Sequence, residues 1–369
     1  MSGMASDTVF QPSFGNKPDK IVGREAVIEG ILSGLGMRSG HRDRATLVIG
    51  QRGMGKTALL LEIADRALGE GFIAARVAAS ANMLDEIVET VQIKGSPFVN
   101  ERKSKVKGFN AGALGFSFGL TFSDEVSSNY GFRTKLSLLC DKLAENDKGV
   151  LLLIDEVQAN TDDMRTLATT YQHLVGEGKN IAIVMAGLPT AVSSVLNDNI
   201  LTFLNRAHKV RLEPLSLESI RVYYRLTFKA LGKEFPSELL DKAVDATRGF
   251  PYLLQLVGYY LEEYSAGSTS ISDGMVSDAV ASAKRDLEAD IFATTLKPLS
   301  DTDVKFLEAM AIDEGPSKVS DIQARLGVSA GYVQSYRARL IEAGVIASER
   351  RGELELTVPY LGEYLRSRE

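Results

Sequence analysis

The stretch Gly50-Gln51-Arg52-Gly53-Met54-Gly55-Lys56-Thr57 decides the fold, because it matches the phosphate-loop pattern G-x-x-x-x-G-K-[ST] at every fixed position. An apolar run at 46–49 precedes it, and a helical pattern at 58–68 follows it. Glycines between a strand and a helix let successive backbone N–H groups turn toward a phosphate, and the helix N-terminus adds partial positive charge. The stretch therefore predicts a nucleotide phosphate site.

Each polar side chain of such a loop has a defined task. The Lys56 ammonium is expected to reach the β- and γ-phosphates, so it is a catalytic as well as a binding residue. The Thr57 hydroxyl is expected to hold Mg²⁺. The predicted nucleotide contacts along this segment are Gly50, Gln51, Arg52, Gly53, Met54, Gly55, Lys56, Thr57 and Ala58.

A second apolar run ends in two carboxylates, Leu151-Leu152-Leu153-Ile154-Asp155-Glu156. Ligands of open α/β sheets bind at the carboxyl ends of the strands, so both carboxylates are expected near the phosphate loop. We predict that Asp155 is the partner of Mg²⁺. We predict that Glu156 is the base that orients and deprotonates the attacking water.

Apolar runs alternate with helical patterns over residues 21–213, which is typical of an α/β fold with a parallel sheet between helical layers. Strands are expected at 46–49, 72–77, 150–154, 181–185 and 208–212. Beyond Pro214 the pattern becomes helical, which predicts a separate all-α lid domain over 214–297. Its helices are expected at 216–231, 236–247, 251–264 and 271–296.

The residues around these motifs resemble the AAA+ ATPase group. The resemblance covers about 20–296 and rests on both motifs, on Ile21-Val22-Gly23-Arg24-Glu25, and on the runs at 181–189 and 204–216. Within the group, the chain most resembles the branch of origin-recognition initiators, transposition-helper ATPases and signalling STAND NTPases. The resemblance implies an AAA+-like P-loop fold that binds ATP/ADP, with Val22, Gly23 and Arg24 near the adenine base.

Two departures from the family pattern favour a slow switch over a fast motor. The fourth strand ends in Met185-Ala186-Gly187, where the family usually has a polar residue that senses the γ-phosphate. The third helix of the lid domain begins at Arg248-Gly249-Phe250-Pro251, which resembles the Gly-x-Pro element of STAND proteins. This resemblance implies that Pro251 packs close to the nucleotide, and Arg248 stands nearby as a further candidate contact.

Arg206 matches the position at which AAA+ rings carry an arginine finger. A finger would act on ATP bound by a neighbouring subunit, which implies a nucleotide-dependent homo-oligomer. The alternative is a surface arginine paired with an acidic neighbour, which contributes little to stability. The sequence leaves both alternatives open.

Residues 298–369 predict a winged helix-turn-helix domain, with helices at 301–311, 319–326 and 330–342 and two short strands at 344–348 and 353–358. Such a domain presents its last helix and its wing to duplex DNA. The residue types suited to phosphate and base contacts there are Tyr332, Gln334, Arg337, Arg339, Arg350 and Arg351.

Charge opposes DNA binding, because residues 301–369 hold 9 Lys+Arg and 12 Asp+Glu, a balance of −3. Two functions therefore stay open. One is an ATP-dependent switch that couples oligomerisation to DNA binding. The other is a STAND-like signalling or assembly ATPase whose winged helix contacts protein. The second usually carries a sensor array of repeats, and no internal repeat is visible.

The 369-residue chain is 44% hydrophobic and 24% charged with a net charge of −6, as in ordinary multidomain proteins. The charge disfavours a surface that is basic all over. The single cysteine, Cys140, excludes an intramolecular disulfide, and the three histidines share no metal-ligand spacing. No apolar run approaches the roughly 20 residues of a membrane span, which predicts a cytoplasmic protein with no membrane partner.

Two segments are less regular. Residues 1–20 are polar and contain prolines and glycines, so they are expected to form a tail or a strap. Residues 95–131 hold a basic run at 102–107 and then a Gly-rich stretch with alternating apolar residues at 116–122, which predicts a projecting hairpin. This insertion is either a flexible surface loop or a contact for DNA or another partner.

Overall fold

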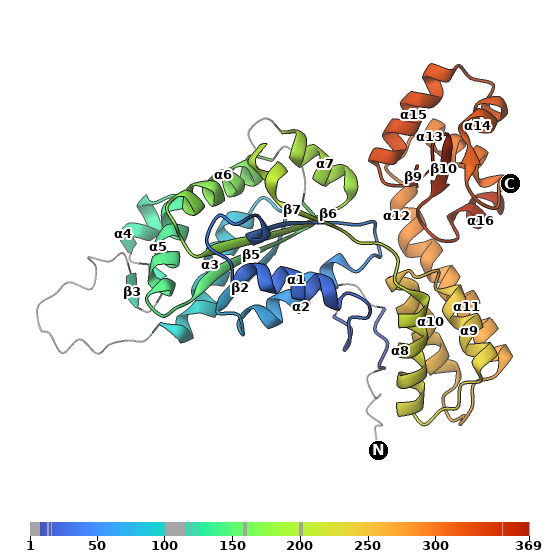
Figure 1. Ribbon diagram of the computed structural model, residues 1–369, viewed down its shortest axis with the longest axis horizontal. Helices are drawn as coiled ribbons and strands as arrows, with labels where there is room; N and C mark the ends of the chain where they lie inside the picture. Colours follow the sequence, from blue (N-terminus) through green and yellow to red (C-terminus); the bar gives the residue numbers. More distant parts are fainter. Residues whose placement is uncertain are drawn as a thin grey trace, which may run out of the picture.

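The computed structural model describes residues 8–12, 15, 17–99, 116–118, 120–122, 124–157, 161–198, 202–348 and 350–368. Three regions follow one another along the described chain: a sheet domain, a helical region and a C-terminal region (Figure 1). The basic run at 102–107 lies outside the described residues. Within the described ranges, no helix combines the length and the apolar character that crossing a membrane would need.

The sheet domain is built on five parallel strands in the order β2-β5-β6-β1-β7. All five predicted strands form this sheet, so the predicted α/β fold class is confirmed. Successive side chains alternate between two apolar clusters: Val48, Leu151 and Leu153 belong to one, and Leu47 and Leu152 to the other. The strands are β1 (Ala45–Ile49), β2 (Phe72–Ala78), β5 (Gly149–Asp155), β6 (Ile181–Gly187) and β7 (His208–Arg211).

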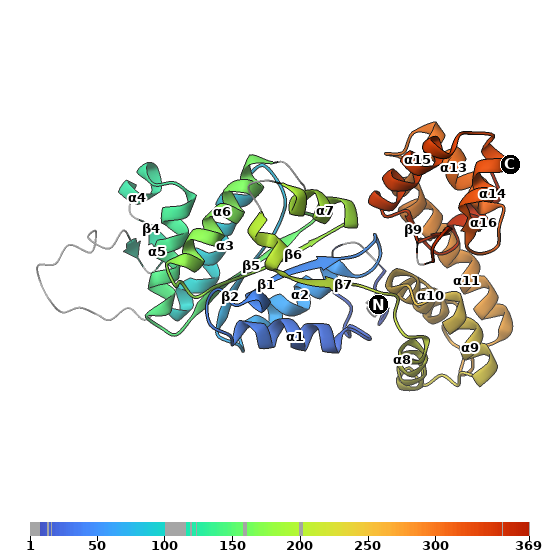
Figure 2. The same cartoon turned by 45° about the horizontal axis from the view of Figure 1, so that its top comes forward.

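Helices cover both faces of the sheet, because each face presents a continuous apolar surface (Figure 2). The first two helices share the apolar cluster of one face, and the next four share the cluster of the other. These helices are α1 (Glu25–Leu35), α2 (Lys56–Ala67), α3 (Met83–Gly95), α5 (Phe132–Ala144), α6 (Asp162–Gly176) and α7 (Pro189–Asn197). Short 3₁₀ turns lie at η1 (Arg42–Arg44), η2 (Ser96–Phe98) and η4 (Thr202–Arg206).

The described end of the insertion contains the predicted hairpin. β3 (Phe116–Phe118) pairs antiparallel with β4 (Thr121–Phe122), and α4 (Asp124–Asn129) follows. The hairpin is a separate two-stranded sheet and does not extend the main one. It is fastened to α3, because Leu120 is buried and its carbonyl accepts a hydrogen bond from the Gln92 side chain at 2.7 Å.

The helical region contains the four predicted helices, but the last one is interrupted. α11 passes through a π-helical turn, η5 (Glu288–Phe292), before it continues as α12 (Ala293–Leu296). Turns of this kind are rare and occur frequently at functional sites. The other helices are α8 (Leu217–Ala230), α9 (Ser237–Ala246), α10 (Pro251–Tyr264) and α11 (Asp273–Leu287).

The C-terminal region contains the three predicted helices, and both predicted strands are shorter than expected. Two elements were missed: β8, which pairs with β10, and the final helix α16. A two-residue strand carries no periodicity, and α16 is a short helix that follows Tyr360, whose φ of 64° is not a helical value. The elements are α13 (Asp301–Ala311), β8 (Ser317–Lys318), α14 (Val319–Leu326), α15 (Ala330–Glu342), β9 (Ile346–Ala347), β10 (Glu353–Leu356) and α16 (Leu361–Arg366).

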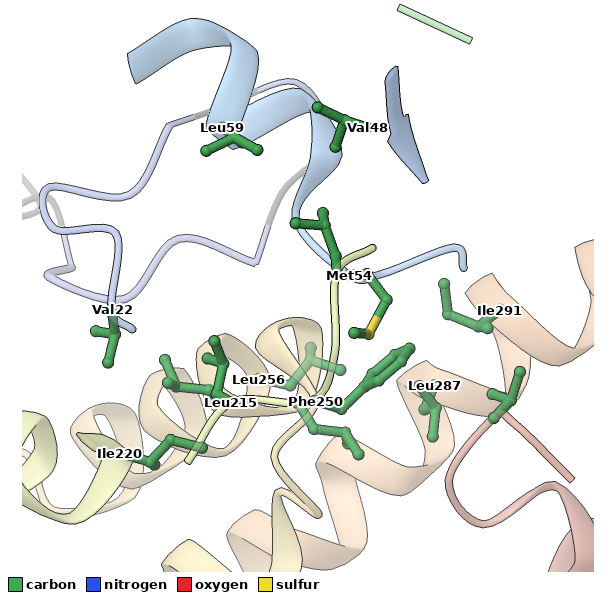
Figure 3. Packing of buried hydrophobic residues seen from close by; sticks show 14 of the residues in the cluster. Val22, Val48, Met54, Leu59, Leu215, Ile220, Phe250, Leu256, Leu287 and Ile291 are labelled. Carbon is green, nitrogen blue, oxygen red and sulfur yellow. The ribbon is translucent and has the colours of Figure 1, made fainter. Parts of the chain in front are cut away.

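One apolar cluster joins the three regions. It includes Leu59 of α2, Met54 of the phosphate loop, Phe250 at the start of α10, Ile291 of η5 and Leu340 of α15 (Figure 3 shows the first four). The phosphate loop therefore lies where the three regions meet.

Candidate nucleotide-binding site

A cavity of about 290 Å³ lies over the phosphate loop, between the sheet domain and the helical region. Residues predicted from four separate stretches of sequence meet there. The predicted residues that line it are Val22, Arg24, Arg52, Gly53, Met54, Gly55, Lys56, Thr57, Ala58, Asp155, Glu156 and Pro251.

Two glycines give the phosphate loop its shape. Gly53 and Gly55 have φ values of +75° and +80°, in the left-handed region that glycine adopts without strain. Position 53 also has no room for a side chain, since an added Cβ would lie 2.6 Å from the Phe250 ring. The Gly53 carbonyl accepts the backbone N–H of Tyr252 at 3.2 Å. The first turn of α10 thus holds the loop directly.

The Lys56 ammonium is held inside the loop. Its Nζ donates to the carbonyl oxygens of Gly50 at 2.9 Å and Gln51 at 2.8 Å. Burial lowers the pKa of Lys56 to about 8, although the Asp155 carboxylate opposes this shift. A phosphate in the cavity would supply the counter-charge that favours the protonated amine.

The carboxylates lie at the end of β5, as predicted. Asp155 is 4% exposed, and its Oδ1 accepts the Glu156 backbone N–H at 3.0 Å. Glu156 is exposed and has a φ of 51°, which is uncommon outside glycine and is a form of strain that clusters at active sites. The Thr57 hydroxyl and the Asp155 carboxylate offer the hard oxygen donors that Mg²⁺ prefers, so the residues present fit this ion.

Part of the cavity wall is apolar, with Ile21, Val22, Leu215 and Leu254 in it, which suits the flat ring of a base. The buried Arg24 also lines it. An Arg24 Nη donates to the Glu213 carbonyl at 2.7 Å, and burial lowers the pKa of this guanidinium. Arg24 therefore links the segment before α1 to the segment before α8 by a hydrogen bond.

Some predicted contacts lie outside the cavity lining. Gly23, whose φ is +67°, shapes the turn before Arg24, and Gly50 contributes its carbonyl to Lys56. The Gln51 side chain points to the C-terminal region, where a Cβ added at Gly344 would lie 2.5 Å from its Nε2.

The two predicted arginines also lie outside this lining. The Arg248 guanidinium stacks over the ring of Tyr360, 5.6 Å from its centroid, and so faces the C-terminal region. The Arg248 backbone has a φ of 50°, which is uncommon outside glycine. Arg206 is exposed at the end of η4.

Sequence reasoning missed a polar pair from the helical region. The Tyr252 hydroxyl donates to Asp290 of η5 at 2.5 Å, and both residues line the cavity. Burial and this carboxylate raise the pKa of Tyr252. The pair forms where α10 meets the π turn, and no local pattern encodes that crossing. Residues of the N-terminal segment also line the cavity. The proline and glycine content of that segment was the sequence signal that could have pointed to this role.

The predicted DNA contacts on α15 have other partners. Gln334 and Arg337 line a groove of about 800 Å³ between α15 and α7. Arg337 donates to the Gln334 amide at 3.2 Å and to the Ser348 hydroxyl at 3.1 Å. Arg339 forms an ion pair with Asp303, a buried carboxylate that also caps α13. These residues therefore contribute to packing within the chain.

Among the remaining predicted DNA contacts, Arg350 and Arg351 are exposed in the turn between β9 and β10. Tyr332 is half-buried, and its ring stacks on Tyr336 with centroids 4.2 Å apart. The exposed members of the predicted set are therefore Gln334, Arg339, Arg350 and Arg351.

Residues 20–184 match a family described as an AAA ATPase domain, and residues 289–365 match a domain of unknown function (DUF8462). The fold is that of an AAA+ P-loop ATPase. This confirms the predicted AAA+-like P-loop fold. No curated protein matches the chain.

Several solved structures are similar to the chain over most of its length. The Walker-type ATPase of Pyrococcus abyssi is 17% identical, with a TM-score of 0.68 over 95% of this chain and 97% of that one. The ORC2 protein of Aeropyrum pernix is 15% identical, with a TM-score of 0.66 over 96% and 95%. CDC6P of Pyrobaculum aerophilum is 16% identical, with a TM-score of 0.51 over 96% and 95%. At these identities the likeness concerns the fold alone.

Proposed function

We propose that this protein binds ATP with Mg²⁺ and hydrolyses it slowly, as a molecular switch. The observation that carries the proposal is the convergence of Lys56, Thr57, Asp155 and Glu156 on one cavity over the phosphate loop. The similar ORC2 protein of Aeropyrum pernix was determined as ADPNP and ADP complexes, which supports adenine nucleotides as ligands.

In this proposal each residue has one role. Lys56 binds the β- and γ-phosphates, and Thr57 and Asp155 hold Mg²⁺, which would neutralise charge on the phosphate oxygens. Glu156 orients the attacking water and accepts its proton. Glu156 lines the cavity and is exposed, which leaves room for that water.

Two observations support slow turnover. β6 ends in Met185, Ala186 and Gly187, so this strand end supplies no polar side chain to the γ-phosphate. Arg248 stacks on Tyr360 and brings no charge to the cavity. Fewer charged groups at the γ-phosphate mean weaker stabilisation of the transition state.

The test compares binding and phosphate release with ATP and GTP, each with and without Mg²⁺. Binding of ATP in preference to GTP, with slow Mg²⁺-dependent phosphate release, supports the proposal. Failure to bind either nucleotide would contradict it.

We also propose that Arg206 acts on ATP in a neighbouring subunit of a homo-oligomer. Its exposure and its place outside the cavity lining support a role between subunits. The specific rate of hydrolysis should then rise with protein concentration, and light scattering should detect association with ATP and not with ADP. A rate that stays flat across the association range would remove Arg206 from the reaction.

A second proposed function is contact with duplex DNA through a winged-helix arrangement of α13–α15 and β8–β10. The exposed Arg350 and Arg351 favour it, because the wing of such a domain reaches the phosphate backbone. Gln334 is also exposed, and it lines with Arg337 the groove between α15 and α7. The test is duplex affinity with and without ATP at low and moderate salt. An affinity that does not fall with salt would contradict DNA binding and favour a protein partner.

A further inference from the structure

Described residues near the start of the chain contact both the helical region and the sheet domain. They comprise residues 8–12, 15 and 17–20, and we name them the N-terminal strap. Its first anchor is Phe10, which is 0% exposed although it lies in a polar stretch of sequence. The Phe10 ring stacks on Phe228 at 5.6 Å and meets Tyr223 and Tyr224 edge-on at 5.7 and 5.6 Å. All three partners belong to α8.

The helical region is shaped to receive this anchor. Any side chain at Gly258 of α10 would collide with the Phe10 ring. The strap backbone is also bound, since the Val9 N–H donates to the Glu262 carboxylate at 3.0 Å and the Gln11 N–H donates to the Gln255 side chain at 3.0 Å. Phe10 therefore fills a groove of the helical region, and the backbone N–H groups of the residues before and after it are hydrogen-bonded there.

The second anchor lies on the sheet domain. Lys17 Nζ contacts the carboxylates of Glu62 at 2.9 Å and Asp65 at 2.6 Å, both on α2. These carboxylates raise the pKa of Lys17, so the ammonium stays charged at neutral pH. α2 begins at Lys56, so the second anchor is on the helix that opens at the phosphate loop.

The nucleotide cavity lies between the two anchors. Strap residues form part of its wall together with apolar side chains, and Gln255, which the strap backbone contacts, also lines it. The strap residues in the lining are Gln11, Pro12, Gly15, Pro18 and Lys20. A nucleotide at this site would thus be enclosed by the sheet domain, the helical region and the strap.

We propose that the N-terminal strap holds the helical region against the sheet domain across the base and ribose of the bound nucleotide, and so sets how long the nucleotide stays. This inference rests on the proposed nucleotide binding. Opening the cavity wall at this end requires one anchor to release. Phe10 and Lys17 are therefore positioning residues that slow nucleotide release without contacting the phosphates.

The experiment measures release of a fluorescent ADP analogue by stopped flow, using the full chain. Phe10→Ala should speed release about tenfold, and Lys17→Ala about twofold, because a surface ion pair is weaker than a buried aromatic anchor. The double variant should release no faster than Phe10→Ala, since loss of the stronger anchor already detaches the strap from the helical region, so the Lys17 ion pair can no longer join the two regions. Phe10→Leu, which keeps an apolar anchor, should restore most of the slow release.

The matched control is Lys179→Ala, which removes a similar surface ion pair, with Asp141, away from the cavity. Its release rate should equal that of the wild type. The strap's role would be overturned if the effects of the two single variants on the release rate multiplied in the double variant, or if all variants released the analogue at the wild-type rate. Either result would leave the proposed nucleotide binding intact. Wild-type protein that binds no ADP analogue would overturn the proposed function, and the strap's role with it. Lys17 lies on the surface, so its variant tests the proposal even where Phe10→Ala lowers the melting temperature.

Discussion

The phosphate end of the cavity and the outer face of α15 are both rich in polar and charged side chains, but only the first set converges. Lys56, Thr57, Asp155 and Glu156 line one cavity. On α15, Arg337 lines a groove against α7, whereas Arg339 is paired with a buried carboxylate. The backbone of a loop and a strand end fixes the first set. The second depends on how one region docks on another.

The largest expected effect belongs to the convergent set. Glu156→Gln keeps the shape of the side chain and removes the base, so hydrolysis should fall by roughly 10²- to 10⁴-fold while ATP binding stays unchanged. Phosphate release and nucleotide titration on the same preparation measure both. A variant that hydrolyses ATP at the wild-type rate would remove Glu156 as the base.

Removing the phosphate-directed cation should have the next largest effect. Lys56→Ala deletes a buried charged donor, and we expect ATP affinity to drop by roughly 100-fold, or about 3 kcal/mol. Isothermal titration measures the change. Lys209→Ala, on β7 away from the cavity lining, is the control and should bind as the wild type does. Tight ATP binding by the Lys56 variant would break the contrast between the two surfaces.

The lowered pKa of Lys56 predicts a pH dependence with a definite sign. The free protein loses the Lys56 proton above about pH 8, whereas bound phosphates favour the protonated amine. Binding must then take up a proton, so Kd should rise by about tenfold per pH unit above 8 and stay level below it. Lys56→Arg, which stays charged, should remove this dependence. A Kd that is constant in the wild type from about pH 7 to about pH 9.5 would contradict the assignment.

The smallest effects should separate the arginines of the C-terminal region. Alanine at Arg350 and Arg351 should weaken duplex binding a few-fold, without changing stability. The salt slope should fall by about one for each phosphate that the variant no longer neutralises. Arg339→Ala should instead lower the melting temperature by a few degrees, because it leaves the buried Asp303 unpaired. If alanine at Arg339, Arg350 and Arg351 lowered DNA affinity equally and left the melting temperature unchanged, α15 and the turn between β9 and β10 would form one DNA-binding surface.

The pKa of Asp303 gives the same prediction a pH window. Burial opposes its ionisation, but hydrogen bonds from Ser300 and Arg339 outweigh burial and lower its pKa. The stabilisation is therefore complete above the unfolded pKa of about 4 and is lost as the pH falls through the lower folded value. Arg339→Ala should raise the pH at which the protein loses stability in acid.

The central strands could be predicted from sequence because they are runs of apolar residues buried on both faces, and the helices of the helical region because each buries a periodic apolar face. The phosphate loop and Asp155 were predictable for a local reason: a few consecutive residues fix their backbone. Tyr252 and Asp290 were not, because they meet where α10 crosses the π turn. Arg248 and Gln51 were predicted to bind nucleotide, but they face Tyr360 and Gly344 of the C-terminal region. Both partners are distant in sequence, so no local pattern indicates these contacts.

The apolar cluster shared by the sheet domain, the helical region and the C-terminal region has a consequence for unfolding. Regions with separate cores melt separately, whereas regions that share one core lose it together. Met54 of the phosphate loop and Leu340 of α15 belong to the same cluster. Any ligand that binds the folded loop therefore protects α15 from opening by mass action, without touching it. Hydrogen exchange in α15 would then report occupancy of a cavity that this helix does not line.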